Sequence, residues 1–501
     1  MKKQILAMLI AASLAGISHN AAAENLLQVY QRAKGYDAQF KAQESSHLAI
    51  LEKKQQALAA SKPQVNLSGK AGYSASRDSI TNNTVDGENA NYTLQLEKSL
   101  YNKGINASIA KTDALVGQSN AALESYRQDL IMRVADAYFA ALIAQDSLNF
   151  ANAEKTAISR QLEQTTAYFE AGRSAITDVK EAESSYAAAI AQEITATQQL
   201  DVAREQLRVI TGGFYPSLNA PRSNMPLAMP TPSSIEAWVN TAKQNNHLLR
   251  ASKHAVTAAQ KEVEAQRAEK FPRVGLYANH TGSYLDNDTF NSRKTNDAAV
   301  GLSMSLPLYT GGATSSKIRE ARHKLQQSQQ EGDLQARMTE QQARSAFLSV
   351  QSSISQVKAN QQALSSAETA AEATQAGFEV GTRTAVDVLN SLRSVFRARR
   401  DYASARYSYL QNNLALRQAA GTLSEKDVVA INAFLTESPK ALVSEPQADA
   451  ASAPAADNIA VTPKQSKVMP EPAEQAPAVA EPASETGAES FDYYVMPGTS
   501  K

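Results

Sequence analysis

FEAGRSAITDV at positions 169–179 returns as FEVGTRTAVDV at positions 378–388, and this repetition decides the fold. Other landmarks recur in the same order. Pro63 and Pro272, and Gly212 and Gly421, also lie 209 residues apart, whereas Tyr101 and Gly104 match Tyr309 and Gly312 at a spacing of 208. An ordered series of matches at nearly one spacing is the signature of an internal repeat. The core of the chain is therefore predicted to contain two copies of one structural unit.

Each copy contains long stretches without a helix breaker. Proline is absent from residues 64–215 and 308–438, and in the first copy glycine is absent from 118–171 and 173–211. Alanine, glutamine, glutamate, leucine and arginine, which form helices well, are frequent there. A helix over 104–171 would be roughly 100 Å long at about 1.5 Å per residue. The sequence predicts two long helical hairpins, which turn at Gly172 and Gly381.

The positions of the breakers predict the domain organisation. A proline-rich stretch separates the two copies, and a low-complexity tail that is rich in proline, alanine and glutamate follows the second. We expect a first repeat at 24–215 (helix, β-hairpin 64–101, helical hairpin 104–211), an equatorial connector at 216–246, a second repeat at 247–437 (helix, β-hairpin 273–309, helical hairpin 312–420, C-terminal equatorial helix) and a disordered tail at 438–501.

The N-terminus has the features of an export signal. Lys2 and Lys3 precede a mainly apolar run at 5–17, and Ala21-Ala22-Ala23 provides small residues for cleavage. The apolar run is shorter than the roughly 20 residues that span a bilayer. We therefore predict a signal peptide at 1–23 and a mature chain that begins at Glu24 and leaves the cytoplasm.

The composition argues against several classes of function. The 50 basic residues balance the 50 acidic ones, so the chain lacks the positive excess typical of nucleic-acid binding. There is no cysteine, which excludes disulfides, thiolate metal sites and cysteine nucleophiles. Its few histidines are scattered, and no phosphate-binding loop or nucleophile motif occurs. We expect no enzyme activity, no cofactor, no metal site and no nucleic-acid partner.

The segments before each long helix alternate between apolar and polar residues. Val65, Leu67 and Tyr73 alternate with polar neighbours, and the second copy repeats the pattern at 274–278 and 298–308. Period-two runs of roughly 9–11 residues are typical of membrane β-strands, although soluble hairpins with one buried face show them too. We expect four strands, polar loops at 75–91 and 281–297, and tyrosines gathered at the strand ends.

Four strands in one chain imply an assembly. An open sheet in lipid would leave backbone groups of its edge strands without hydrogen-bond partners. Two chains would supply eight strands, whose barrel interior is filled by side chains, whereas three would supply twelve and begin to leave a lumen. A trimer with a pore along its axis is the simplest solution, but the sequence alone does not fix the number of chains.

The paired stretches at 169–179 and 378–389, together with the junctions SLYNKG at 99–104 and PLYTGG at 307–312, resemble the TolC-type outer-membrane channel family. The resemblance extends over about 24–433. It implies an α+β membrane protein: a homotrimer with a 12-stranded β-barrel in the outer membrane of a Gram-negative bacterium, continued by a periplasmic α-helical tunnel with an equatorial mixed domain. It also implies export of small molecules or proteins together with a periplasmic adaptor and an inner-membrane efflux pump or ABC transporter.

The resemblance further implies a constriction at the periplasmic entrance. Family members have two stacked acidic rings there; Asp387 matches the first, and the second position is Asn390, an amide. Three converging carboxylates raise some of their pKa values and attract cations. The amide is expected to weaken cation selectivity. On its spacing alone, Asp387 is equally well explained as a carboxylate that stabilises a helix N-terminus.

A gate is the second implied feature of the tips. In the family an arginine of the second hairpin bonds to a Thr-Asp pair of the first, which corresponds here to Arg383 with Thr177 and Asp178. A tyrosine that adds a further bond in the family is replaced by Phe378, so one closing bond is expected to be missing. An ordinary surface ion pair, worth little, is the alternative explanation of the arginine and its partners.

The main alternative to a channel is a periplasmic coiled-coil adaptor or structural protein. Such a protein would use the helical hairpins but not the alternating strands. The four strands and the repeat along the whole core disfavour it. The sequence does not reveal the cargo.

Overall fold

The computed structural model describes residues 24–77, 80, 84–222, 225–287 and 292–441. The predicted signal peptide and nearly all of the predicted tail lie outside the described residues. In the described part no helix combines the length and apolar character needed to cross a membrane.

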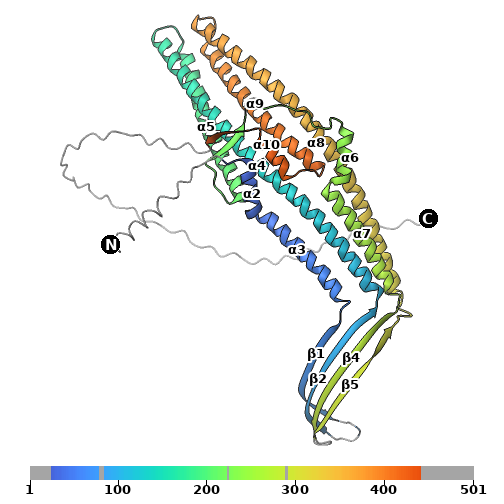
Figure 1. Ribbon diagram of the computed structural model, residues 1–501. Helices are drawn as coiled ribbons and strands as arrows, with labels where there is room; N and C mark the ends of the chain where they lie inside the picture. Colours follow the sequence, from blue (N-terminus) through green and yellow to red (C-terminus); the bar gives the residue numbers. More distant parts are fainter. Residues whose placement is uncertain (1–23, 78–79, 81–83, 223–224, 288–291, 442–501) are drawn as a thin grey trace, which may run out of the picture. The chain divides into compact units, whose positions relative to one another are not determined.

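Two long helical hairpins dominate the described chain (Figure 1). The first consists of α4 (Lys103–Glu170) and α5 (Ile176–Thr211), and the second of α8 (Ala313–Glu379) and α9 (Ala385–Ala419). The hairpins pack against each other chiefly through α4 and α9, which places α5 and α8 at opposite edges of the layer α5–α4–α9–α8. Their lengths agree with the prediction: no proline lies in these helices, so no backbone hydrogen bond is lost, and the glycines inside α4 and α8, such as Gly117 and Gly332, do not end them.

Buried polar bonds join α4 to α9. The Tyr407 hydroxyl donates to Asp146 Oδ2 at 2.6 Å, and both side chains are buried. Further toward the tips, Arg400 Nη1 donates to Glu154 Oε2 at 2.9 Å. A charge-assisted bond in a poorly hydrated seam costs more to break than one on the surface. The two hairpins are therefore held together firmly in this part of the layer.

A shorter helical pair precedes each β-hairpin and breaks at an equivalent place. α2 (Leu26–Tyr36) meets α3 (Ala38–Ala59) at Asp37, and α6 (Ile235–Asn245) meets α7 (His247–Ala268) at Asn246. Each residue caps the helix that follows: Asp37 Oδ1 accepts from the Phe40 N–H at 2.6 Å, and Asn246 Oδ1 accepts from the Leu249 N–H at 3.0 Å. The break is therefore a repeated feature.

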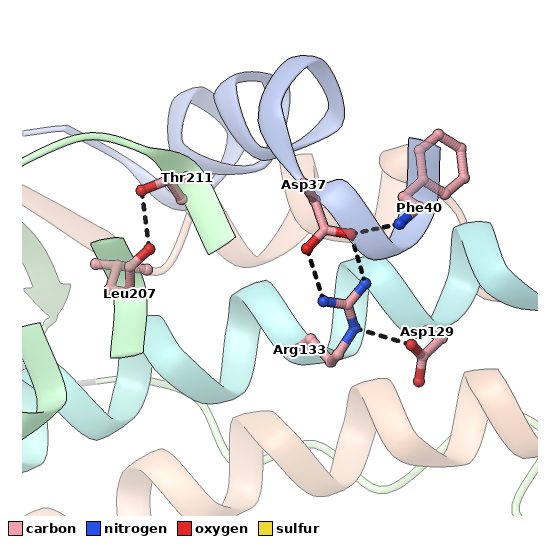
Figure 2. Close-up of polar contacts among 6 residues, drawn as sticks. All are labelled: Asp37, Phe40, Asp129, Arg133, Leu207 and Thr211. Carbon is pink, nitrogen blue, oxygen red and sulfur yellow. Dashed lines mark hydrogen bonds and ion pairs between the residues drawn. The ribbon is translucent and has the colours of Figure 1, made fainter. Parts of the chain in front are cut away.

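The two breaks differ in how they are tied to the long helices. Arg133 of α4 donates two bonds of 2.9 Å to the carboxylate of Asp37, and its Nε donates to Asp129 (Figure 2). The guanidinium holds the pKa of Asp37 below its ordinary value. Asn246 instead donates through Nδ2 to the carbonyl of Ala419 at 3.1 Å. One copy uses an ion pair where the other uses an amide.

The four strands that adjoin the long helices form one antiparallel sheet. β1 (Gln64–Arg77), β2 (Thr84–Tyr101), β4 (Arg273–Asn287) and β5 (Arg293–Ser305) pair in the order β1-β2-β4-β5 (Figure 1). Four strands per chain were predicted, and the pairing of β2 with β4 joins the two copies. β1 and β5 are the edge strands.

The register separates an apolar face from a polar face. Cross-strand rows on one face include Val65–Leu96–Ala278–Val300 and Leu67–Leu94–His280–Ala298; rows on the other include Ser68–Thr93–Thr281–Asp297. On the apolar face Leu67 and Val300 are 73% and 75% exposed. Apolar side chains left so open on a whole sheet face indicate contact with a nonaqueous surrounding.

The strands are longer than the alternation predicted. β1 and β2 pair through 75–77 and 84–91, and β4 and β5 pair through 281–285 and 293–297, so the two predicted 17-residue loops are mostly strand. The prediction was wrong because backbone hydrogen bonds continue where both faces become polar. As a result Tyr92 lies within β2, where its ring covers Gly282, and not at a strand end.

A small second sheet and a short helix complete the described chain. β3 (Ser217–Pro221) pairs with β6 (Leu435–Ala441), and α10 (Glu425–Asn432) precedes β6. The hydrophobic core lies beside this sheet, where Tyr30, Tyr138 and Phe139 are almost fully buried. The predicted tail begins at 438, but β6 includes its first four residues, so that boundary was wrong. The β3–β6 pair secures the chain end against the connector.

Candidate functional site at the helical tips

The two hairpins end in turns of the same backbone form. After α4 the Gly172 N–H bonds to the Phe169 carbonyl at 2.9 Å, and after α8 the Gly381 N–H bonds to the Phe378 carbonyl at 3.0 Å. The φ angles of Gly172 and Gly381 are 70° and 83°. A left-handed residue is the usual way to end a helix, and glycine adopts it without a Cβ clash. Each turn then starts a new helix within a few residues.

Asp387 is held as the third residue of α9. Its Oδ2 accepts from the N–H and the hydroxyl of Thr384, both at 3.0 Å, and the Asp387 N–H donates to Thr384 Oγ1 at 3.2 Å. These bonds form a capping box. In the single chain they lower the pKa of Asp387, first through the backbone N–H of Thr384 and then through its hydroxyl. The carboxylate is partly exposed.

Asn390 lies one turn further along α9 than Asp387. Its side chain is exposed, and its backbone carbonyl accepts from the Ser394 hydroxyl at 2.9 Å. Residues three apart share a helix face, so the amide and the Asp387 carboxylate point to one side of α9. The predicted constriction pair is therefore brought onto one surface of the chain.

Within the single chain the predicted gate residues are not bonded to one another. Asp178 Oδ2 accepts from the Ser174 hydroxyl at 2.8 Å and from the Ala175 N–H at 3.4 Å, and Thr177 is exposed. Arg383 is exposed, and its Cγ lies over Gly377, 2.8 Å from where a Cβ would be. Among the described residues no ion pair joins Arg383 to Asp178. The bond between the two hairpins stays a prediction.

Phe378 is buried and contacts a residue that the sequence analysis missed. It is 8% exposed, packs with Ala385 and Val388, and its ring lies 5.5 Å from the ring of Tyr168. The guanidinium of Arg173 lies 4.5 Å above Tyr168. Tyr168 occupies the repeat position of Gly377, so comparison of the two copies could have drawn attention to it. This aromatic contact joins the two tips.

The described residues at the tips form no metal site. No group of three or more histidine, aspartate or glutamate side chains in the described part is placed to hold a metal. The tips instead combine helix-capping carboxylates, an exposed amide and an exposed guanidinium. Carboxylates attract cations, guanidiniums attract anions, and the two groups bind each other.

Comparisons with known proteins agree with this arrangement. The family model described as "Outer membrane efflux protein" matches residues 29–213 and 238–422, one match for each repeat. The outer membrane protein TolC of Escherichia coli is 34% identical over 449 residues, which cover 87% of this chain and 90% of TolC. The alkaline protease secretion protein AprF of Pseudomonas aeruginosa is 32% identical, with 87% and 93% covered.

A solved structure shows the same fold at low sequence identity. The outer membrane protein VceC of Vibrio cholerae superposes with a TM-score of 0.67 at 18% identity, over 79% of this chain and 96% of VceC. The matches thus extend over most of each chain, and the fold agrees with that of VceC.

Proposed function

Because the chain belongs to the outer membrane efflux protein family and is therefore an outer-membrane export channel, we propose that three copies close into one tunnel whose periplasmic entrance is formed by the helical tips. The observation that carries this proposal is that the described chain has two unlike open edges. β1 and β5 are edge strands at the two sides of the sheet, and both have unpaired backbone groups on their outer side. In lipid such edges must pair, and β1 of one copy against β5 of the next closes the sheet.

The helical layer has matching open edges. On α5 the side chains of Ile194, Val202 and Val209 are 64%, 44% and 74% exposed; on α8 Leu334 and Leu348 are 57% and 53% exposed. If the α5 edge of one copy contacts the α8 edge of the next, the contact is head-to-tail. Such contacts produce a closed ring when the rotation from one copy to the next divides a full turn evenly. Three copies give twelve strands, enough to begin to leave a lumen.

In the closed ring Asp387 of each copy would face the axis, with Asn390 one turn away. Three carboxylates in a narrow opening attract cations and raise one another's pKa, whereas the Thr384 bonds lower it. The Asn390 amide adds polarity without charge. We infer a constriction that prefers cations, but less strongly than two acidic rings would.

The entrance would be held closed by Arg383 of the second tip, bonded to Thr177 and Asp178 of a first tip. Asp178 has acceptor capacity left, because a carboxylate offers about four lone-pair sites and the described bonds occupy one oxygen. An arginine–carboxylate bond of this kind is one that a docking protein can displace. We infer that a periplasmic adaptor opens the tips in this way.

The relatives indicate which partners and cargo fit this role. One is named for the secretion of alkaline protease, and another, from Cupriavidus metallidurans, for cobalt-zinc-cadmium resistance. The channel is proposed to work with an adaptor and an inner-membrane efflux pump or ABC transporter, and to take its cargo specificity from that pump. Small molecules and proteins are both within this proposal.

Single-channel recording in a planar lipid bilayer tests the proposal. We expect a small, steady conductance that prefers potassium over chloride and loses this preference in Asp387→Ala. Asp113→Ala is the control, because it removes one carboxylate that is bonded to Lys54, away from the tips. Failure of the protein to insert into the bilayer would contradict the channel. An unaltered preference for potassium in Asp387→Ala would contradict the constriction.

A further inference from the structure

α9 carries four arginines within eight residues: Arg393, Arg397, Arg399 and Arg400. Two of them have carboxylate partners on neighbouring helices. Arg399 Nη2 donates to Glu368 Oε1 of α8 at 2.9 Å, and Arg400 Nη1 donates to Glu154 Oε2 of α4 at 2.9 Å. These two side chains fasten α9 to the rest of the layer.

Arg393 and Arg397 have no such role. Arg397 is exposed and Arg393 partly exposed, and neither has an ion pair or side-chain hydrogen bond within the described part of the chain. They lie four residues apart, so the two guanidiniums are neighbours on the helix surface. Like charges at this spacing repel, which disfavours the pair unless negative charge comes near it.

These arginines lie on the helix face that carries the proposed constriction. Asp387, Asn390, Ser394, Arg397 and Asp401 follow one another at steps of three and four residues, which is the spacing of a single face. Arg393 is three residues after Asn390 and borders the same face. The face continues into a polar groove of about 490 Å³ between α8 and α9, lined by hydroxyls and amides with Asp401, Ser404 and Ser408 among them.

Resting on the proposed function, we propose that Arg393 and Arg397 form a positively charged band inside the tunnel that binds polyvalent anions. At about 1.5 Å per residue the band lies roughly 9–15 Å above Asp387. Three copies supply six guanidiniums there against three Asp401 carboxylates, so the band keeps a positive excess. A narrow, partly dehydrated passage strengthens such a field, and guanidinium groups bind phosphate and carboxylate oxygens in a fork geometry.

The band would give the tunnel two successive filters. Cations gather at Asp387, and anions with two or more closely spaced charges are retained about two to three helical turns further in. Cargo with acidic segments would gain a binding step after passing the entrance. The acidic entrance and the basic band therefore act on different charges.

Block of single channels by inorganic tripolyphosphate tests this inference. The purified full-length protein is recorded at low salt, because exposed charges are screened at high ionic strength. We expect tripolyphosphate to block the wild-type channel, and Arg393→Ala with Arg397→Ala to weaken the block by roughly tenfold or more and to raise the preference for potassium over chloride. Arg399→Ala removes the same charge two residues from Arg397 but on the side facing Glu368, and should leave the block unchanged.

The outcomes separate this inference from the proposed function. Channels that conduct normally but resist tripolyphosphate, or that are blocked equally in wild type and the double variant, would overturn the anion band and leave the channel intact. An equal loss of block in Arg399→Ala would also overturn it, because the effect would then come from net charge alone. Protein that forms no channel would overturn both.

Discussion

The two helical tips have nearly the same backbone but different side chains. The first tip (residues 168–178) and the second tip (residues 377–387) each turn through a left-handed glycine and place an aspartate as the third residue of the next helix. At the equivalent positions between, the first has Ser174 and Ala175 where the second has Arg383 and Thr384. Both copies thus retain the glycine and the aspartate that form the turn. The residues that differ are the ones to which we assign different roles at the two tips.

The clearest difference is in what surrounds the aspartate. Thr384 encloses Asp387 in a full capping box, whereas Ala175 offers no side-chain acceptor to the Asp178 N–H, and the Asp178 carboxylate accepts from the Ser174 hydroxyl and, at 3.4 Å, from the Ala175 N–H. Asp387 is therefore fixed in place, as the proposed constriction needs. Asp178 is held more loosely and is better suited to exchange partners.

The largest effect should follow from removing the proposed bond between the two tips. Arg383→Ser combined with Asp178→Ala is expected to raise single-channel conductance several-fold, because the entrance loses its charge-assisted closure in every copy. Lys180→Ala, which removes an exposed charge from α5 just beyond the first tip, is the control. Conductance in the double variant equal to wild type would show that Arg383 and Asp178 do not close the entrance.

A smaller change is expected from making the second tip more acidic. Asn390→Asp adds a second carboxylate one turn from Asp387, so the preference for potassium over chloride should rise by roughly twofold or more. Reversal potentials in a potassium chloride gradient measure it. A preference that does not change would place residue 390 away from the ion path.

Phe378→Tyr tests whether the second tip lacks a closing bond. A hydroxyl at this position is expected to stabilise the closed entrance by about 1 kcal/mol per chain and so to lower the mean conductance. Phe169→Tyr, at the repeat-equivalent and exposed position of the first tip, should have no effect. A higher conductance in Phe378→Tyr would mean that the hydroxyl disturbs the packing on Tyr168 without finding a partner.

The smallest effects should come from exchanging the caps. Thr384→Ala is expected to destabilise the start of α9 by about 1 kcal/mol, and Ala175→Ser to stabilise α5 by a similar or smaller amount. Thermal unfolding of the purified protein in detergent compares them. Unfolding temperatures that fall in Thr384→Ala and rise in Ala175→Ser would support the assigned caps. Equal shifts of the two unfolding temperatures would contradict them.

Thr384→Ala should also change how the cation preference depends on pH. The Thr384 bonds lower the pKa of Asp387, so their stabilisation is present above the ordinary aspartate pKa and is lost as the pH falls through the lowered value. Without the hydroxyl the pKa should rise, although the backbone N–H bond remains. Cation preference in Thr384→Ala should therefore fade at a higher pH than in wild type, as a titration of the reversal potential would show.

The long helices could be predicted well because long stretches of the sequence lack the residues that break helices. No glycine or proline interrupts 173–211, so α5 had to be helical, and Gly172 and Gly381 marked the turns. Strand length could not be predicted as well. Residues 84–91 pair through backbone hydrogen bonds. Where both faces of the sheet are polar, the sequence shows no alternation of apolar and polar residues that would predict a strand. The β3–β6 pair was missed because its strands are short and lie more than 200 residues apart.

At the tips, sequence reasoning found the charged residues but not their local partners. Asp178 was singled out, but Ser174, four residues before it, was not, because a serine hydroxyl gives no pattern of its own. The contact between Tyr168 of α4 and Phe378 of α8 joins two different hairpins, and its geometry depends on how the hairpins pack.

The two open edges of the sheet have a consequence for how the protein is made. Before the proposed ring closes, a newly exported chain would expose one unpaired edge on each of β1 and β5, strands of 14 and 13 residues. Such edges pair readily with any other strand, and a face of exposed apolar side chains adds to the hazard. The lifetime of the lone chain in the periplasm should therefore be kept short, by prompt assembly or by a chaperone that covers these strands. Biogenesis then depends on the rate at which copies meet.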